Sequence, residues 1–436
     1  MQPAPSGPPG QATALLTDHY ELTMLQASLA RGTGNRRATF ETFARRLPDG
    51  RRYGVVGGTG RLLDEIEHFR FDEDALAYLS DNDVVDDRTL SWLSEYRFSG
   101  DVWGYAEGEC YFPHSPILVV ESTFAEAVLL ETLILSVLNF DSAIAAAASR
   151  MSIAAGERPI IEMGSRRTHE RAAIAAARAA YIGGFASTSN LEAGRRYSVP
   201  TRGTSAHSFT LLHDTERDAF TAQVDSLGKG TTLLVDTYDV AEAVALAVEI
   251  AGPELGAVRL DSGDLLVQAH HVRRQLDELG ATSTRIVVTS DLDEYAIAAL
   301  ASAPVDGYGV GTYLVTGSGA PTASMVYKLV ARADDDGAIV PVEKVSKDKH
   351  SVGGRKSAWR RLPSGVAEAE VIRERSASGA SDERELLLPL IRDGAVVGRE
   401  PLHHARERHA ASRAQLPEAA HRLSRGEPAV PTVFEE

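Results

Sequence analysis

The chain has 436 residues but a single cysteine, Cys110. One thiol excludes an intramolecular disulfide and a cysteine-based zinc cluster, and it is typical of a protein that works in a reducing compartment. We therefore expect a cytoplasmic protein. The length exceeds what one ordinary hydrophobic core supports, so more than one domain is expected.

The sequence also lacks a basic segment. Its 45 Lys and Arg residues are scattered among 61 Asp and Glu residues, which gives a formal net charge of −16. An acidic surface repels phosphate backbones and anionic lipids unless a local basic patch intervenes. We expect neither nucleic acid nor a membrane as a partner.

Long apolar runs are absent as well. The most apolar stretch, 125–144, is interrupted by Glu126, Glu131, Asn139 and Asp141, whereas a membrane span needs about 20 nearly uninterrupted apolar residues. This stretch is predicted to be a buried helix. Residues 1–12 are rich in Pro and Gly without the apolar core of a signal peptide, so a disordered lead-in is expected there.

Common catalytic signatures are missing too: there is no Walker A motif, GxSxG, HExxH or CxxC. P-loop, α/β-hydrolase and zinc-enzyme assignments therefore lack support. The turn at 54–60 is rich in glycine, but its spacing fits neither a dinucleotide-binding nor a P-loop template. A helix-entry turn explains it better than a phosphate cradle.

Alternation of short apolar strands with helices is what the sequence does contain. Strands are predicted at 159–162, 185–187, 204–206, 231–235, 257–260, 285–289 and 307–310. Such alternation is typical of a parallel sheet covered on both faces. Polar candidates follow at least five strands, which favours a barrel over an open sheet, since an open sheet gathers its ligands at one switch point.

We therefore predict an α/β protein: an irregular (β/α) barrel with an α+β sandwich domain built from the N-terminal region and part of the C-terminal region. The expected parts are an N-terminal α+β domain at 13–120, the barrel at 121–325, and a C-terminal region at 326–436 that packs back on the N-terminal domain.

Several strand ends carry residues suited to chemistry. His207 lies among small residues in Gly203-Thr204-Ser205-Ala206-His207-Ser208, where a ligand can come close to the backbone. A histidine packed at a strand end is the simpler interpretation, but other candidate residues near predicted strand ends favour a site. These residues are Arg166, Asp236, Arg259, Asp261, Asp264, Gly311 and Thr312.

Each residue type suggests a partner. Arginines at strand ends suit an anion, and paired carboxylates suit Mg²⁺ or vicinal sugar hydroxyls. One of Asp261 and Asp264 is also expected to cap the following helix. Backbone N–H groups in the 309–312 turn can hold a phosphate, as barrels commonly do after their last strands. Together these features predict a site for a phosphorylated sugar.

At this point the motifs resemble those of the nicotinate phosphoribosyltransferase family of NAD salvage, over nearly the whole chain. The resemblance rests on the TDxYxxTM-like opening at 17–24, the GxRR-like turn at 164–167, the GTxAHS-like segment at 203–208, DTY at 236–238, VRLDSGDL at 258–265 and GxGT at 309–312. A basic tail, formed by Lys344, Ser346, Lys349, Lys356 and Arg360, is similar to the family's KxSxxK…GxKxxxR segment.

The resemblance implies an enzyme that joins nicotinate to 5-phosphoribosyl 1-diphosphate, giving nicotinate mononucleotide and diphosphate. ATP hydrolysis would be coupled through a phosphohistidine at His207, with Asp261 as the second catalytic residue. Mg²⁺ would lie at Asp261 and Asp264, and Asp236 would join these two carboxylates in serving the ribose. Tyr20, Arg166, Thr204 and Arg259 would contact nicotinate, and Gly311 and Thr312 would hold the 5-phosphate.

By the family pattern the protein would be a head-to-tail homodimer, with Tyr20 completing the partner's site. By the same pattern the basic tail would hold an anion. One departure is Gly353, where the family usually has proline before the glycine of the basic tail. Alternatives that stay open are a nicotinamide or quinolinate phosphoribosyltransferase and a non-catalytic sugar-phosphate sensor on the same scaffold.

Overall fold

The computed structural model describes residues 12–344 and 352–435. The chain divides into two compact units, one formed by 1–146 with 320–436 and the other by 147–319. The sequence-based boundaries at 121 and 325 differ from these. The reason is that β5 (Leu118–Thr123) and the first half of α6 (Glu131–Ala155) belong to the core of the first unit.

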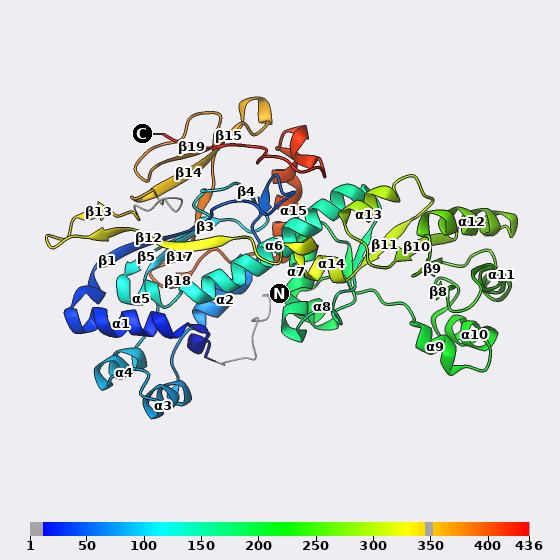
Figure 1. Cartoon of the computed structure of the whole chain (residues 1–436), viewed down its shortest axis with the longest axis horizontal. Helices are drawn as coiled ribbons and strands as arrows, with labels where there is room; N and C mark the ends of the chain where they lie inside the picture. Colours follow the sequence, from blue (N-terminus) through cyan, green and yellow to red (C-terminus); the bar gives the residue numbers. More distant parts are fainter. Residues whose placement is uncertain (1–11, 345–351, 436) are drawn as a thin grey trace. The chain divides into compact units, whose positions relative to one another are not determined.

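Antiparallel sheet dominates the first unit (Figure 1). Its seven-stranded sheet has the order β13-β12-β1-β5-β3-β17-β18, in which the N-terminal β1 pairs with β12 from the C-terminal region. The strands of this sheet are β1 (Arg37–Ala44), β3 (Asp101–Tyr105), β5, β12 (Met325–Ala333), β13 (Ile339–Pro341), β17 (Leu387–Arg392) and β18 (Ala395–Val396).

A second sheet of this unit has the order β16-β14-β15-β19 and is built entirely from C-terminal residues. Its strands are β14 (Lys356–Arg361), β15 (Ala369–Glu374), β16 (Glu383–Glu385) and β19 (Thr432–Phe434), while β2 (Gly54–Val55) pairs with β4 (Cys110–Tyr111). The helices are α1 (His19–Arg31), α2 (Thr59–Glu67), α3 (Glu73–Asp81), α4 (Asp87–Ser94), α5 (Phe124–Val128) and α15 (Leu402–Ala414).

The long apolar helix α6 passes a length and hydropathy test for a membrane span among the described residues, but 72% of its most apolar window is buried inside the protein. Leu133, Ile134 and Leu138 belong to the hydrophobic core. The stretch 125–144 is helical and buried as predicted, but it forms two helices, α5 and the first part of α6, separated by a turn at 129–130.

The glycine-rich turn before α2 leads into that helix, and its backbone N–H groups already bind a carboxylate of the protein, that of Glu107. The Glu107 carboxylate accepts hydrogen bonds from the backbone N–H groups of Gly58 at 2.6 Å and Gly60 at 3.2 Å, and the Ser142 hydroxyl accepts from Gly57 at 3.1 Å. A side-chain carboxylate thus satisfies the helix N-terminus that a phosphate would otherwise use.

The basic tail is not a row of free cations in the described residues. Arg360 is fully buried and donates to Glu109 Oε1 at 2.7 Å, to Cys110 O at 2.6 Å and to Glu370. Burial lowers the pKa of Arg360, but Glu370 and Glu109 outweigh that effect and raise it above its ordinary value. Lys356 is likewise buried, with its Nζ 2.6 Å from Glu41 Oε2. The expected role of both residues in holding an anion is therefore corrected.

Other parts of the tail are less informative. Ser346 and Lys349 lie outside the described residues. Gly353 fits a tight position, since a Cβ there would lie 2.9 Å from the carbonyl oxygen of Val342. The departure from the family proline thus occurs where the backbone of a neighbouring segment comes close.

The second unit contains one sheet of six parallel strands with the order β7-β6-β11-β10-β9-β8. The strands are β6 (Ile160–Glu162), β7 (Ser187–Thr188), β8 (Thr232–Leu234), β9 (Ala257–Leu260), β10 (Arg285–Thr289) and β11 (Gly307–Val310). Val258, Ile286 and Val310 are fully buried, as expected for strands covered on both faces.

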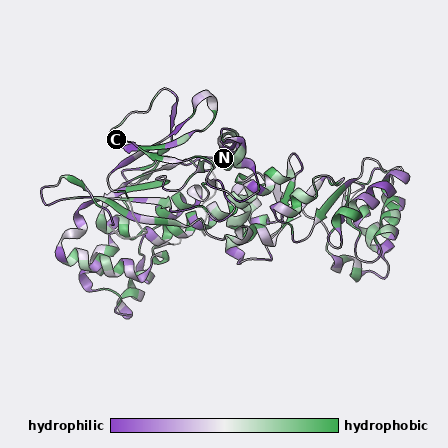
Figure 2. Cartoon of the chain, turned by 45° about the horizontal axis from the view of Figure 1, so that its top comes forward, coloured by the Kyte–Doolittle hydropathy of each residue, from purple (hydrophilic) through white to green (hydrophobic). Residues whose placement is uncertain are grey.

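Helices follow most of these strands: α7 (Glu170–Ile182), α8 (Leu191–Tyr197), α9 (His207–Leu212), α10 (Glu216–Leu227), α11 (Val240–Ala251), α12 (Leu265–Glu278), α13 (Glu294–Ala299) and α14 (Thr312–Val315). In Figure 2 the helices at the right-hand end of the view carry both green and purple stretches, which is typical of helices with one buried and one solvated face.

The six strands follow one another in the order expected around a barrel, except that β7 and β8 are not paired, so the barrel is open between them. The predicted strand at 204–206 would fill that gap, but those residues form no strand, and only an isolated bridge joins Thr188 to Thr201. The sequence there is Thr-Ser-Ala, without the large apolar side chains that hold the other strands in the core. The α/β fold is confirmed, whereas a closed barrel is not seen among the described residues.

Arg360 offers a test of the buried ion pairs. Replacing it with methionine leaves Glu370 buried without its cation and leaves Glu109 with Arg384 alone, so Arg360→Met is expected to lower the free energy of unfolding by about 3–5 kcal/mol. Arg399→Met removes a more exposed arginine that pairs with Asp64 and Glu67, and it should cost no more than about 1 kcal/mol. Urea unfolding followed by circular dichroism measures both, and equal midpoints for the two variants would contradict the assignment.

Candidate active site

The candidate residues of the second unit gather at the carboxyl ends of its parallel strands. Asp236 follows β8, Asp261 follows β9, and Thr289 ends β10. His207 is the first residue of α9, in the segment that connects β7 to β8 along the chain. Because the carboxyl ends of parallel strands share one edge of a sheet, residues more than fifty positions apart meet there.

His207 lies between a hydroxyl and two carboxylates. Its Nδ1 is 3.2 Å from Thr237 Oγ1, and its Nε2 is 3.9 Å from Asp236 Oδ1 and 3.8 Å from Asp261 Oδ2. The side chain is 38% exposed, so a ligand from solvent can reach the ring. The predicted neighbourhood of His207, Asp236 and Asp261 is present in the structure.

Each carboxylate is held through one oxygen and directs the other toward His207. Asp236 Oδ2 accepts from the backbone N–H of Asp261 at 2.8 Å and from Ser262 Oγ at 2.7 Å, while Asp261 Oδ1 accepts from the Thr289 hydroxyl. Asp236 Oδ1 is buried and has no hydrogen-bond partner among the described residues. A buried carboxylate oxygen without a donor is costly, and it marks a position for a cation or a donor from a ligand.

Arg259 is the buried cation of the site. Its Nη1 donates to Thr204 Oγ1 at 2.8 Å, and its Nε–H is buried with no partner in the part of the chain that the structure describes. Burial lowers the pKa of Arg259, while Asp261 and Asp236 raise it and the nearby Arg166 lowers it further. A partly unsatisfied guanidinium beside a second arginine is suited to a planar carboxylate.

Arg166 itself is exposed, in the turn that follows β6. That turn is anchored by Glu162, which is fully buried and accepts from the backbone N–H of Gly164 and from the Thr188 hydroxyl. Burial raises the pKa of Glu162. Glu162 therefore ties the arginine turn to β7.

The glycines at the ends of β6 and β11 permit close packing. A Cβ on Gly309 would lie 2.5 Å from Thr289 Cγ2, and one on Gly164 would lie 2.3 Å from Val315 Cγ1. Gly311 and Thr312 begin the short helix α14 at this edge and are half-buried. Their backbone is thus accessible, as the predicted phosphate-binding role requires.

Asp264 differs from the other two carboxylates. It is the N-cap of α12, where its Oδ1 accepts from the backbone N–H of Val267 at 3.1 Å. Asp236, rather than Asp264, is the residue that converges with Asp261 on His207. The capping interpretation offered for one member of the Asp261/Asp264 pair applies to Asp264.

No group of three or more His, Cys, Asp or Glu side chains suited to a metal occurs within 12–344 and 352–435. Mg²⁺ does not need such a group, since it commonly binds one or two carboxylates and completes its shell with water and substrate phosphates. The unpartnered Asp236 Oδ1 and the nearby Asp261 Oδ2 fit that donor set.

Tyr20 belongs to the first unit, in the first turn of α1, and is 43% exposed. Partial burial and the charges of Glu131 and Glu21 raise its pKa to about 12. Within its own unit the ring is exposed enough to contact a ligand.

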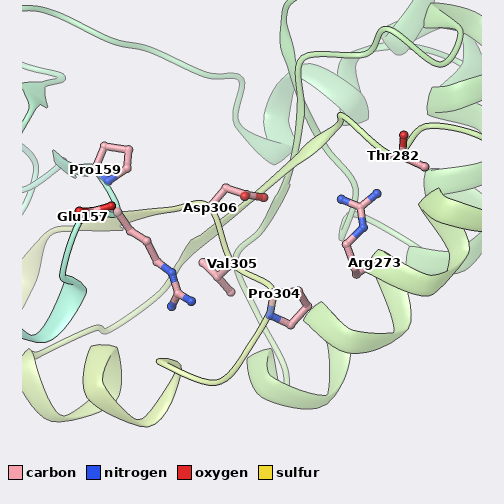
Figure 3. Close-up of a pocket in the computed structure, with 8 residues that line it drawn as sticks. Glu157, Pro159, Arg273, Thr282, Pro304, Val305 and Asp306 are labelled. Carbon is pink, nitrogen blue, oxygen red and sulfur yellow. The ribbon is translucent and has the colours of Figure 1, made fainter.

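A cavity of about 510 Å³ in the second unit is distinct from this site (Figure 3). Pro159 and Asp306 precede β6 and β11, so the cavity lies at the amino ends of the strands. Arg158 donates to the carbonyls of Leu300, Ala301 and Ala303, and Arg273 donates to those of Ala281 and Thr284. Because both guanidiniums already donate to backbone carbonyls, they are less suited to binding a ligand. This favours the strand edge at His207 as the active site.

Sequence reasoning missed the hydroxyls of the site: Thr237, Ser262 and Thr289. Thr237 and Ser262 follow strands that were already marked by an aspartate, whereas Thr289 ends β10, for which no candidate was predicted. The position alone could have indicated them, but the atoms they contact depend on the register between strands.

A family model, the nicotinate phosphoribosyltransferase (NAPRTase) N-terminal domain, matches residues 15–139. The chain is 59% identical over 429 residues to nicotinate phosphoribosyltransferase pncB1 of Mycobacterium tuberculosis, covering 96% of this chain and 94% of the relative. It is 37% identical to the Bacillus subtilis nicotinate phosphoribosyltransferase over 359 residues, covering 80% of this chain and 73% of the relative.

The crystal structure of human nicotinic acid phosphoribosyltransferase is similar across 97% of this chain and 98% of the human chain, with a TM-score of 0.83 and 26% identity. An α/β fold with charged residues at the carboxyl edge of a parallel sheet is typical of enzymes that bind their substrates at that edge. Within that class, the chain belongs to the nicotinate phosphoribosyltransferase family.

The N-cap of α12 can be tested separately from the chemistry. Asp264→Asn keeps an oxygen acceptor for the Val267 N–H and should leave stability nearly unchanged, whereas Asp264→Ala should lower the free energy of unfolding by about 0.5–2 kcal/mol. Thermal unfolding of both variants gives the comparison. An equal loss of stability for alanine and asparagine would show that the carboxylate has another structural role.

Proposed function

We propose that this protein is a nicotinate phosphoribosyltransferase that joins nicotinate to 5-phosphoribosyl 1-diphosphate, giving nicotinate mononucleotide and diphosphate with coupled ATP hydrolysis. This reaction would be the first step of NAD synthesis from nicotinate, in the cytoplasm. Membership of the family supports the substrates. The observation that carries the site assignment is the convergence of Asp236 and Asp261 on His207, beside Arg259 bonded to Thr204.

Arg259 is proposed to recognise the nicotinate carboxylate, with Arg166 as a second positive charge. The Nε–H of Arg259 lacks a partner in the described structure, so a carboxylate could take it together with a neighbouring N–H of the same guanidinium. Thr204 would keep the guanidinium in place through its bond to Nη1. The Tyr20 ring, from the second subunit of a homodimer with shared sites, would stack on the pyridine.

The sugar phosphate would lie across the same strand edge. Gly311 and Thr312 are proposed to hold the 5-phosphate, and Asp236, Asp261 and Asp264 to bind the ribose hydroxyls. Displacement at the anomeric carbon passes through a cationic state, so carboxylates beside the ribose stabilise the developing charge. Mg²⁺ was predicted at Asp261 and Asp264, but Asp264 caps α12 and Asp236 Oδ1 is the unpartnered oxygen, so we place the ion at Asp236 and Asp261 instead. It would neutralise the departing diphosphate when bound.

His207 is proposed to accept the γ-phosphoryl group of ATP. Its ring is accessible from solvent and close to two carboxylates that would stabilise a cationic phosphorylated ring. A nicotinamide enzyme would be favoured by a carboxylate positioned to meet an amide, but the residue that contacts Thr204 here is a cation. A quinolinate enzyme or a non-catalytic sensor would not need an accessible histidine between two carboxylates.

The central experiment measures nicotinate mononucleotide formation with and without ATP, and with nicotinamide or quinolinate in place of nicotinate. We expect nicotinate to be preferred and ATP to stimulate the reaction. In parallel, labelled ATP should leave acid-labile, base-stable phosphate on the wild type. His207→Ala should abolish the label, and His271→Ala, which alters an exposed histidine of α12, should retain it.

The result that contradicts the assignment is equal labelling of the wild type and His207→Ala. Turnover with nicotinamide or quinolinate but not with nicotinate would replace the substrate assignment. Absence of turnover with all three, in protein that binds 5-phosphoribosyl 1-diphosphate, would favour the sensor.

Arg259→Lys tests the carboxylate contact. Lysine keeps the charge but loses the planar pair of donors. A hydrogen bond to a charged group contributes about 1.5–3 kcal/mol, so kcat/KM for nicotinate should fall roughly 10- to 150-fold. Phosphorylation of His207 by ATP should change much less. An unchanged kcat/KM for nicotinate would show that Arg259 serves another group.

A further inference from the structure

We infer that Thr237 determines which nitrogen of His207 takes the phosphoryl group, by accepting a hydrogen bond from Nδ1–H and leaving Nε2 as the nucleophile. This inference rests on the proposed function, because it concerns the same phosphohistidine. Thr237 would be a positioning residue that acts through His207, and it need not touch the substrates.

The first step is the proton count of the ring. A neutral imidazole carries one proton, so one nitrogen donates and the other keeps a lone pair. Of the two nitrogens, only Nδ1 is at hydrogen-bond distance from a described protein atom, Thr237 Oγ1 at 3.2 Å. The Nε2 atom is 3.8 Å and 3.9 Å from its nearest carboxylate oxygens, which is too far for a hydrogen bond.

The opposite arrangement leaves the ring N–H without an acceptor from the protein at hydrogen-bond distance. If Thr237 donated to Nδ1, the proton would be on Nε2, and neither Asp236 Oδ1 nor Asp261 Oδ2 lies close enough to accept it. With the proton on Nδ1, the bond to Thr237 is made and the lone pair of Nε2 faces the carboxylate side of the ring. The arrangement with the proton on Nδ1 therefore makes use of the Thr237 oxygen as an acceptor within the protein.

The transfer step then balances without moving the ring proton. The Nε2 lone pair forms the N–P bond to the γ-phosphorus of ATP, the P–O bond to the β-phosphate breaks, and its electron pair leaves on ADP. Nδ1 keeps its proton, so the phosphorylated ring is cationic. Its bond to Thr237 becomes charge-assisted and strengthens, while Asp236 and Asp261 lie close enough to stabilise the positive ring.

The experiment compares the wild type with Thr237→Ser, Thr237→Val and Thr282→Val. Serine keeps the hydroxyl, valine removes it at nearly the same volume, and Thr282 is an exposed threonine at the opposite end of the strands. Nitrogen NMR of ¹⁵N-histidine-labelled protein, with His207→Ala to assign the signal, gives the tautomer before any reaction. Phosphorus NMR identifies the phosphorylated nitrogen, and labelled ATP gives the rate.

We expect the Nδ1–H tautomer and phosphate on Nε2 in the wild type, Thr237→Ser and Thr282→Val. Thr237→Val should lose the single tautomer and be phosphorylated about tenfold more slowly, the effect of one lost hydrogen bond. A purely structural role for Thr237 would lower stability or rate without changing the tautomer, and serine need not rescue it.

Phosphate on Nδ1 of the wild type, or Thr237→Val with an unchanged tautomer and rate, would overturn the inference. Failure of the proposed function has a different signature, which is a wild type without any phosphohistidine in the presence of ATP. In that case the phosphoryl part of the inference falls as well, and an Nε2–H tautomer in the wild type would separately refute the hydrogen bond to Thr237.

Discussion

Parallel pairing of β8, β9 and β10 is the constraint on which the candidate site depends. Leu234 is in register with Arg259, and Leu260 with Val288. This register places Asp236, Asp261 and Thr289 at one edge of the sheet, where the N–H of Asp261 can reach the Asp236 carboxylate. A shift of one residue would turn alternate side chains to the other face and separate these groups.

Hydrogen bonds from fixed hydroxyl and amide groups then orient each charged side chain of the site. Ser262 and Thr289 each hold one carboxylate oxygen, and Thr204 holds Arg259. A site organised this way does not have to rotate its dipoles when substrates arrive, which is the source of most electrostatic catalysis. The unsatisfied atoms, Asp236 Oδ1 and Arg259 Nε, are the groups that substrates or a cation would satisfy.

Sequence reasoning predicted the elements better than their contacts. Six of the seven predicted strands in the second unit are present, because alternation of short apolar strands with helices is a local signal. The prediction of a strand at 204–206 was wrong. Thr204 bonds to Arg259 instead, and this segment has no large apolar side chain that would join the core. Cysteine count, charge and composition did not help to predict which strands are present or that 204–206 is not a strand.

Contacts that depend on distant residues could not be predicted. Nothing local distinguishes Asp236 from Asp264 as the partner of Asp261, because the choice follows from strand register and from the cap of α12. The same holds for Arg360, whose position in a basic motif suggested an anion site. It bonds to Glu109, 251 positions away, and to Glu370, and only the three-dimensional structure shows that these carboxylates already neutralise it.

The charge balance at His207 connects the geometry to the proposed need for Mg²⁺. Two unit charges 4 Å apart interact by about 4 kcal/mol at an effective dielectric constant of 20. A phosphoryl group arriving at Nε2 would meet Asp236 and Asp261 at nearly this distance, so two uncompensated carboxylates would repel it. After transfer the same carboxylates face a cationic ring and stabilise it. Asp236 and Asp261 would hold a divalent cation, and its positive charge would offset the repulsion of the arriving phosphoryl group when it is bound.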